Sequence, residues 1–142
     1  MILIEQDQIV KRLGNLATSR SVYVEMGEPI LYDVGDVWFF DIRCRQVIGF
    51  CAINIKTKKL KYLYTVNESR GEGIGSKLLN NAIIFCKTNN ILELSAVCPT
   101  AYLQFYQNRG FDLIKSFKNY HKIKTTISNG KSIIQNYRTG EL

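Results

Sequence analysis

Residues 67–79, "NESRGEGIGSKLL", place three glycines at the point where a helix should begin. Glycine is unfavourable there, because it costs about 1 kcal/mol relative to alanine inside a helix. The preceding residues 59–66, "KLKYLYTV", are rich in aromatic and branched side chains and predict a strand. Apolar residues behind the glycines recur at offsets of three and four, which is typical of one helical face: Leu78, Leu79, Ala82, Ile83 and Cys86. The chain therefore has to form a strand, a glycine turn and a helix in this order.

A helix that opens on glycines is suited to bind an anion. Its first N–H groups lack partners within the helix and carry the positive end of the helix dipole. Glycine also lets the backbone approach a bound group closely, and a phosphate fits such a turn. The alternative is a surface turn that binds nothing, because glycine-rich turns are common.

The length and composition favour a compact intracellular protein. A chain of 142 residues suits one domain, so we expect a single domain over residues 1–142. The sequence has no run of about 20 apolar residues and no signal-peptide pattern, so we expect a cytoplasmic protein without a membrane partner. Its four cysteines form no CxxC pair and accompany a single histidine. We therefore expect no metal site, and we expect the cysteines to be small buried side chains.

The formal net charge of +7 raises the question of a nucleic-acid partner. The basic residues concentrate at residues 56–61 and 115–138. No helix-turn-helix pattern or aromatic RNA-binding signature accompanies them, so nucleic acid is possible but not favoured. A phosphate-rich cofactor or an acidic partner accounts for the charge equally well.

The remaining pattern predicts an α/β (α+β layered) fold. A helix is expected at 6–20, followed by an irregular stretch at 21–36. Six strands are expected, at residues 37–44, 47–56, 59–66, 91–98, 111–119 and 132–139. A helix at 100–109 is expected between the fourth strand and the fifth. Asn129–Gly130 favours a hairpin turn between the last two strands. The crossover helix should place 59–66 and 91–98 side by side in parallel, within a mixed and mostly antiparallel sheet flanked by helices.

Two motifs resemble those of a known family. "RGEGIG" at 70–75 resembles the Gln/Arg-x-x-Gly-x-Gly/Ala acetyl-CoA signature of the GNAT superfamily of N-acetyltransferases. "FYQNRGF" at 105–111 resembles the second landmark of that family, Tyr-x-x-x-Gly-Phe. The resemblance covers residues 37–117 and implies a GNAT-like sheet whose parallel strand pair is splayed. It also implies acetyl-CoA, or another acyl-CoA, as co-substrate and no metal.

The resemblance assigns a cofactor site to the strand and the glycine turn. In this family the pyrophosphate of CoA lies on the backbone N–H groups of the turn, and the pantetheine arm runs along the preceding strand. Arg70 opens the turn, and its alternative role is to pair with a carboxylate such as Glu68. The implied cofactor-binding residues are Tyr64, Thr65, Val66, Arg70, Gly71, Glu72, Gly73, Ile74, Gly75 and Ser76.

The resemblance also indicates catalytic candidates. Tyr106 stands where related enzymes keep the tyrosine that hydrogen-bonds the CoA sulfur, and a phenol with a pKa near 10 is able to donate a proton. Its alternative role is to pack in the core beside Phe105 and Phe111. The backbone N–H of Val66 is the expected donor to the oxyanion.

The general base is harder to place. Glu93 is the only carboxylate on either strand of the parallel pair and is the candidate base, with a solvent-facing side chain as the alternative. His121 lies in a basic segment and is expected at the surface. Related enzymes often carry an asparagine before the second landmark helix, where this chain has Pro99 or Thr100.

The expected acceptor is a primary amine of a protein, a peptide or a small molecule. Four acidic residues at 25, 28, 33 and 36 would suit a cationic small molecule, whereas the basic segment favours a macromolecule. Two other classes stay open. One is a nucleic-acid-directed acyltransferase, either toxin-like on aminoacyl-tRNA or DNA-modifying. The other is a non-catalytic acyl-CoA-binding regulatory domain. The sequence does not indicate an oligomeric state.

Overall fold

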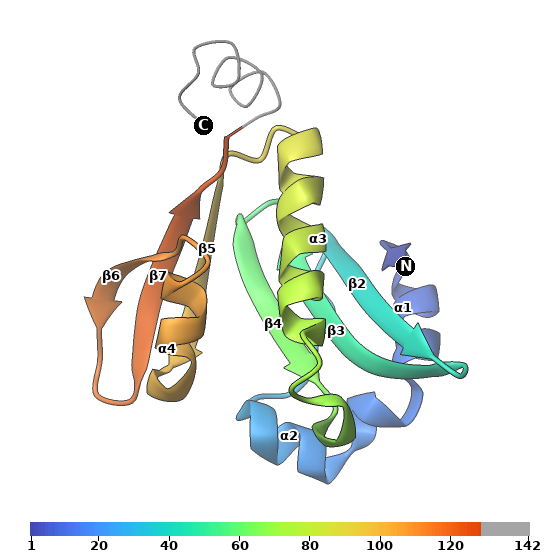
Figure 1. The fold of residues 1–142 in the computed structure, drawn as a ribbon. Helices are drawn as coiled ribbons and strands as arrows, with labels where there is room; N and C mark the ends of the chain where they lie inside the picture. Colours follow the sequence, from blue (N-terminus) through green and yellow to red (C-terminus); the bar gives the residue numbers. More distant parts are fainter. Residues whose placement is uncertain (129–142) are drawn as a thin grey trace. The chain divides into compact units, whose positions relative to one another are not determined.

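The computed structural model describes residues 1–128 (Figure 1). Its elements follow in the order β1 (Ile2–Leu3), α1 (Gln6–Leu13), η1 (Gly14–Thr18), α2 (Arg20–Met26), β2 (Asp36–Arg43), β3 (Gln46–Asn54), β4 (Lys59–Thr65), η2 (Asn67–Ser69), α3 (Ile74–Thr88), β5 (Glu93–Pro99), α4 (Thr100–Gln107), β6 (Asp112–Ser116) and β7 (Tyr120–Thr126). The strands pair in the order β1-β2-β3-β4-β5-β7-β6. The mixed, mostly antiparallel sheet with helices confirms the predicted fold class.

The chain divides into two compact units. Unit 1 consists of Met1–Lys56 and Lys61–Ala82, and unit 2 of Thr57–Leu60 and the chain from Ile83 onward. Each unit is described by itself below. The expected single domain and the splay of the parallel pair therefore stay predictions.

Unit 1 is built on the predicted antiparallel meander. β2 and β3 pair from Asp36↔Asn54 to Arg43↔Gln46, with an irregularity after Asp41. Alternate residues of the strands point to one side, where aromatic rings form the core with α1 and α2. The ring of Trp38 lies 5.7 Å from that of Phe50 and 5.4 Å from that of Tyr62, between centroids. Alternate aromatic residues of the three strands thus form one core.

The N-terminal helix is shorter than expected. α1 ends at Leu13 because Gly14 takes a φ of 53°, and the chain continues as η1. A second helix, α2, then forms where the sequence indicated irregular structure. The side chain of Ser19 accepts a hydrogen bond from the N–H of Val22, and α2 ends at Gly27 in a left-handed conformation. The prediction was wrong for residues 21–26, although a serine and a glycine at these places are ordinary helix boundaries.

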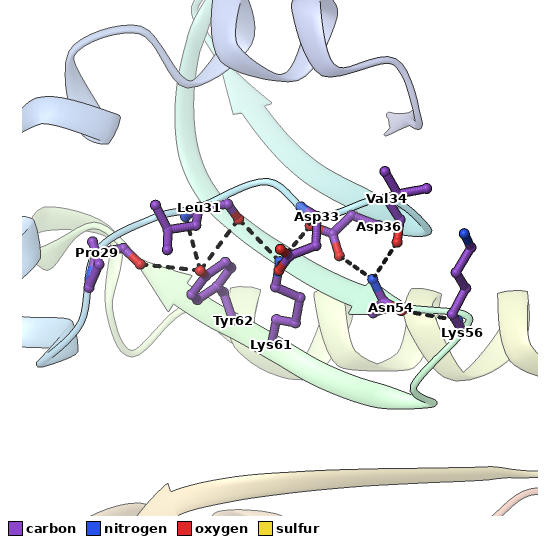
Figure 2. Close-up of polar contacts among 9 residues, drawn as sticks. All are labelled: Pro29, Leu31, Asp33, Val34, Asp36, Asn54, Lys56, Lys61 and Tyr62. Atoms are coloured by element: carbon purple, nitrogen blue, oxygen red, sulfur yellow. Dashed lines mark hydrogen bonds and ion pairs between the residues drawn. The ribbon is translucent and has the colours of Figure 1, made fainter.

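A buried carboxylate fixes the loop that follows α2 (Figure 2). Asp36 is fully buried, and its Oδ1 accepts a hydrogen bond from Asn54 at 2.9 Å. Its Oδ2 accepts from the N–H of Asp33 at 2.8 Å and from Lys61 Nζ at 2.5 Å. The hydroxyl of Tyr62 also accepts from the N–H of Leu31 at 3.0 Å. Loop 29–36 is therefore tied to both β3 and β4.

Unit 2 contains the parallel pairing and a three-stranded antiparallel part. β4 pairs with β5 in parallel through Lys59↔Ser95, as predicted. β5 pairs with β7 from Glu93↔Thr126 to Pro99↔Tyr120, and β7 pairs with β6. The helix α4 joins β5 to β6 (Figure 1).

The C-terminal hairpin differs from its prediction. Its second strand is β7, so the turn lies at residues 117–119. In β7 the buried residues His121, Ile123 and Thr125 alternate with more exposed ones, but the mixture of lysines and threonines hides this period in the sequence. The expected strand 132–139 and the turn at Asn129–Gly130 lie outside the described residues.

The cysteines are free, and three of them are buried as expected. Burial raises the pKa of Cys86 to about 11. Cys44 is exposed, which corrects the prediction, because it lies with Arg45 in the β2–β3 turn, where both residues have positive φ. Within residues 1–128, no helix is long and apolar enough to cross a membrane, and no group of acidic, cysteine and histidine side chains is arranged to hold a metal ion.

Candidate functional site

The glycine turn joins η2 to α3 in unit 1. Gly71 and Gly73 have φ values of +84° and +79°, which other residues adopt only at a cost. A Cβ added to either glycine would meet no atom within 4 Å. The space beside the backbone is therefore open, and a bound group is able to approach these amides. This open turn at the start of a 15-residue helix fits the phosphate group that the sequence implied.

A third glycine holds the start of α3 against the sheet. A Cβ on Gly49 of β3 would lie 2.9 Å from Ile74 Cγ2 and 3.0 Å from Leu78 Cδ1. It would also lie 3.1 Å from the carbonyl oxygen of Tyr64. The first turn of α3 therefore packs directly on the strand backbone, and this contact fixes where the glycine turn can lie. The predicted residues Ile74, Gly75 and Ser76 form that first turn.

Arg70 links the glycine turn to β4 and α2. Its Nε donates to the carbonyl oxygen of Thr65 at 3.0 Å, and its Nη2 forms an ion pair with Glu25. The guanidinium carbon lies 5.6 Å from the centre of the Tyr64 ring, and the Tyr64 hydroxyl donates to Glu25 Oε2 at 3.4 Å. Arg70 thus pairs with a carboxylate, but with Glu25 rather than with Glu68. The sequence missed this partner because it lies on the helix that was not expected.

The electrostatics of this cluster follow from its partial burial. Burial and the negative charge of Glu25 raise the pKa of the Tyr64 hydroxyl above its ordinary value. Glu72, on the other side of the turn, pairs with Arg43 at 3.3 Å. Both side chains of that pair are about half exposed, so the pair contributes little to stability.

The backbone of Val66 is already occupied. Its N–H donates to the carbonyl oxygen of Ile48 at 2.9 Å, and its own carbonyl accepts from the N–H of Ser69 at 3.0 Å. The expected role of the Val66 N–H as oxyanion donor is therefore not supported. Successive peptide groups along a strand point to opposite edges, so the N–H of Thr65 points away from β3.

Tyr106 lies on α4 in unit 2 and is buried. Its ring packs edge-on against Phe105, with centroids 5.2 Å apart, and against Phe111, with centroids 5.3 Å apart. This is the packing role that the sequence offered as an alternative. It leaves the role of the hydroxyl open, because the ring would pack in this way in either case.

The contacts of Glu93 argue against a general base. Its Oε2 lies 2.7 Å from Lys124 Nζ, and the hydrogen bond and positive charge of Lys124 lower the pKa of the carboxyl group. The pairing Lys59↔Ser95 also places Glu93 beside the start of β4, whereas the sequence placed the oxyanion donor at the other end, at Val66. The position of Glu93 therefore argues against a role as base.

His121 is buried, so its expected surface position is wrong. Its Nε2 lies 2.9 Å from Thr100 Oγ1, and its Nδ1 lies 2.8 Å from Ser116 Oγ. Thr100 is the first residue of α4, directly after Pro99 ends β5. The histidine thus connects the start of α4 to the end of β6 within unit 2.

Comparison with known proteins identifies the family. Residues 33–113 match the model of the acetyltransferase (GNAT) domain. The chain therefore belongs to the GNAT acetyltransferase family, as its two motifs indicated. No curated protein sequence matches it significantly.

Solved structures share the fold. Escherichia coli ElaA aligns with a TM-score of 0.72 and 15% identity, over 88% of this chain and 97% of that one. A GNAT acetyltransferase from Staphylococcus aureus Mu50 aligns with a TM-score of 0.69 and 18% identity, over 90% of this chain and 99% of that one. The PaiA N-acetyltransferase of Thermoplasma acidophilum, solved in complex with coenzyme A, aligns with a TM-score of 0.60 and 18% identity, over 87% of this chain and 80% of that one.

Proposed function

We propose that this protein transfers an acyl group from acetyl-CoA, or another acyl-CoA, to a primary amine. The observation that carries the proposal is the open glycine turn, where Gly71 and Gly73 hold positive φ values beside empty space. Family membership supports acyl-CoA as co-substrate. The coenzyme A in the Thermoplasma structure belongs to that protein and adds support by analogy of fold.

The pyrophosphate of the co-substrate would lie on the backbone amides of residues 71–76. These amides belong to a turn and a helix start, where unpaired N–H groups and the helix dipole both favour an anion. The peptide-like pantetheine arm would pair with the backbone of Tyr64, Thr65 and Val66, as an added strand does. Thr65 contributes most to this pairing, because its backbone groups point away from β3, whereas both backbone groups of Val66 are already bonded within unit 1.

The transfer joins the amine nitrogen to the thioester carbonyl carbon and breaks the bond between that carbon and sulfur. The amine loses a proton, and the departing thiolate gains one. We assign the second proton to the hydroxyl of Tyr106, and the oxyanion contact to the N–H of Thr65 in place of that of Val66. The backbone alternation described above supports this choice of donor.

Glu25 replaces Glu93 in our proposal for the base. It already contacts Tyr64 and Arg70, two of the residues around the end of β4. Its carboxylate would hold the acceptor amine and take its proton directly or through water. In contrast to Glu93, it lies at the end of β4 that the proposal assigns to the thioester.

The acceptor class is proposed to be an amine of a protein or peptide, with a small-molecule amine as the alternative. A cytoplasmic location suits this activity and agrees with four cysteines that form no disulfide. The test incubates the purified protein with acetyl-CoA and a panel of peptide and small amines. Thiol release and a product heavier by one acetyl group are expected for at least one amine. Thiol release at the buffer rate with every amine, despite measurable acetyl-CoA binding, would contradict an enzyme and favour a non-catalytic acyl-CoA-binding domain.

A further inference from the structure

The net charge of the chain is concentrated in unit 2. Unit 1 has nine Lys and Arg residues and nine Asp and Glu residues. In unit 2, residues 57–60 and 83–128 contain eight basic residues and two acidic ones, Glu93 and Asp112. Such a separation is typical of a surface that attracts a polyanion.

Part of this charge gathers on one face of the β6–β7 hairpin. Along β7, Tyr120 and Lys122 point to the side opposite the buried His121. Lys115 of β6 is in register with Lys122, so both lysines lie on the same side. Phe117, in the turn between these strands, completes what we call the β7 face: Lys115, Phe117, Tyr120 and Lys122.

The aromatic rings of the β7 face are stacked and flanked by cations. The rings of Phe117 and Tyr120 lie 4.6 Å apart between centroids, with 15° between their planes. Lys115 Nζ lies 5.1 Å, and Lys122 Nζ 5.7 Å, from the centre of the Phe117 ring. Tyr120 is 43% exposed. The face therefore offers one exposed ring, that of Tyr120, stacked on a partly buried Phe117 that has two positive charges beside it.

The two lysines carry charge that the rest of the described chain leaves uncompensated. Like charges directly opposite one another destabilise a strand pair. Within residues 1–128, neither Lys115 nor Lys122 forms an ion pair, and nearby Glu93 is paired with Lys124. An anion bound between the two lysines would relieve their repulsion.

We propose that the β7 face binds a single-stranded polynucleotide. An unpaired base would stack on the exposed ring of Tyr120, which Phe117 supports from its other face, and backbone phosphates would contact Lys115 and Lys122. This combination of a stacking surface with a basic track is how proteins bind single strands without sequence preference. An acidic peptide would use the lysines but not the rings, and a duplex would hide its bases from them.

The proposal does not rest on acyl transfer. The GNAT match ends at residue 113, and Lys115, Phe117, Tyr120 and Lys122 all lie beyond it. Loss of acetyl-CoA binding would leave this proposal standing, and loss of polynucleotide binding would leave the acyltransferase standing.

The test measures fluorescence anisotropy of a labelled oligo(dT) of about 16 nucleotides, the upper end of single-site lengths. Tyr120→Ala should weaken binding roughly 5- to 150-fold, the usual effect of losing one stacked base. Tyr23→Ala is the matched control, because Tyr23 is 52% exposed and lies in unit 1. Each protein is first compared by its melting curve, so that a folding defect is recognised.

A second pair of variants tests the lysines. Lys115→Gln with Lys122→Gln should reduce the slope of log K against log salt by about 1.4, since each single-strand phosphate contact contributes about 0.7. The melting temperature should change little, because the substitution removes a like-charge pair together with two exposed cation–π contacts. Lys11→Gln with Lys56→Gln, in unit 1, should leave the slope unchanged.

Four results would each overturn the proposal. These are no saturable binding at low salt, wild-type affinity in Tyr120→Ala, equal affinity for the duplex of the same length, and equal competition by polyglutamate. The last result would assign the β7 face to acidic proteins instead.

Discussion

Arg70 connects three parts of unit 1 through one side chain: the glycine turn, the end of β4 and helix α2. The sequence indicated that this arginine either opens an anion-binding turn or pairs with a carboxylate. Pairing with a carboxylate was one of these two predicted roles, because an arginine near a surface turn commonly forms an ion pair with an acidic side chain. The sequence did not predict which carboxylate, since Glu25 lies on a helix 45 residues earlier in the chain. Long-range partners depend on packing that local patterns do not contain.

Tyr106→Phe separates catalysis from packing at the residue scale. The substitution keeps the ring between Phe105 and Phe111 and removes only the hydroxyl. If the hydroxyl protonates the departing sulfur, kcat should fall about 10²- to 10⁴-fold while acetyl-CoA affinity and melting temperature stay nearly unchanged. Steady-state thiol release at several pH values, beside a melting curve, measures this. Wild-type turnover in the variant would remove Tyr106 from the mechanism.

Lys61→Met tests the buried network in Figure 2. Asp36 would lose its cation while keeping two other donors, so we expect a loss of about 1–3 kcal/mol in the free energy of unfolding. Burial alone would lower the pKa of Lys61, but its hydrogen bonds to Asp33 and Asp36 outweigh burial and raise it. A raised pKa means that the contribution is complete below the ordinary lysine pKa of about 10.4 and is lost as the pH rises through the higher folded value.

The difference between wild type and Lys61→Met should therefore be constant from neutral pH to about pH 10 and shrink above it. Urea unfolding curves across this range give the difference directly. Comparing the two proteins at each pH cancels the titrating groups that do not interact with Lys61. Tyr62 is not one of these groups, because burial raises its pKa and the charge of Lys61 lowers it, so its titration is followed separately by tyrosine absorbance. A difference that grows above pH 10 would show that the ion pair is not what stabilises loop 29–36.

At the scale of elements, strands whose buried side is wholly apolar or aromatic were predictable, and the strand with polar residues on both sides, β7, was not. β2, β3, β4 and β5 lie close to their expected ranges, because their buried residues dominate the local composition. β7 was not predicted, because its exposed side is lysine-rich and its buried side includes the polar residues His121 and Thr125. α2 was not predicted either, because its apolar pattern is also weak. It is only seven residues long, and its single buried residue, Val22, leaves no periodic pattern.

Gly49→Ala tests how closely α3 packs on β3. The added Cβ would lie 2.9–3.1 Å from two side chains of α3 and from the backbone of β4, so atoms would have to shift. Overpacking of this kind typically costs about 1–3 kcal/mol. Thermal unfolding should show a lower melting temperature. Acetyl-CoA affinity should also fall, because the position of the glycine turn depends on the first residues of α3. Unchanged stability would mean that α3 is free to move away from the sheet.

At the scale of the whole molecule, family membership supports the proposed acyl transfer, and the uneven charge supports the proposed polynucleotide binding. The GNAT match spans residues 33–113, and this range includes both the glycine turn and Tyr106. The sequence predicted this much because both motifs are local. The β7 face depends on the pairing of β6 with β7, whereas the sequence predicted a different second strand for this hairpin. The face was therefore recognised only from the structure.

Acetyl-CoA binding to the glycine turn is the central claim, and calorimetric titration of Gly73→Val tests it most directly. Gly27→Val is the matched control, because Gly27 has a φ of +76° against +79° for Gly73, and a Cβ meets no atom within 4 Å at either position. Both variants should therefore pay a similar conformational cost. We predict that wild type and Gly27→Val bind acetyl-CoA and gain melting temperature from it, whereas a folded Gly73→Val does neither. Acetyl-CoA affinity in Gly73→Val equal to that in Gly27→Val would contradict the assignment of the turn.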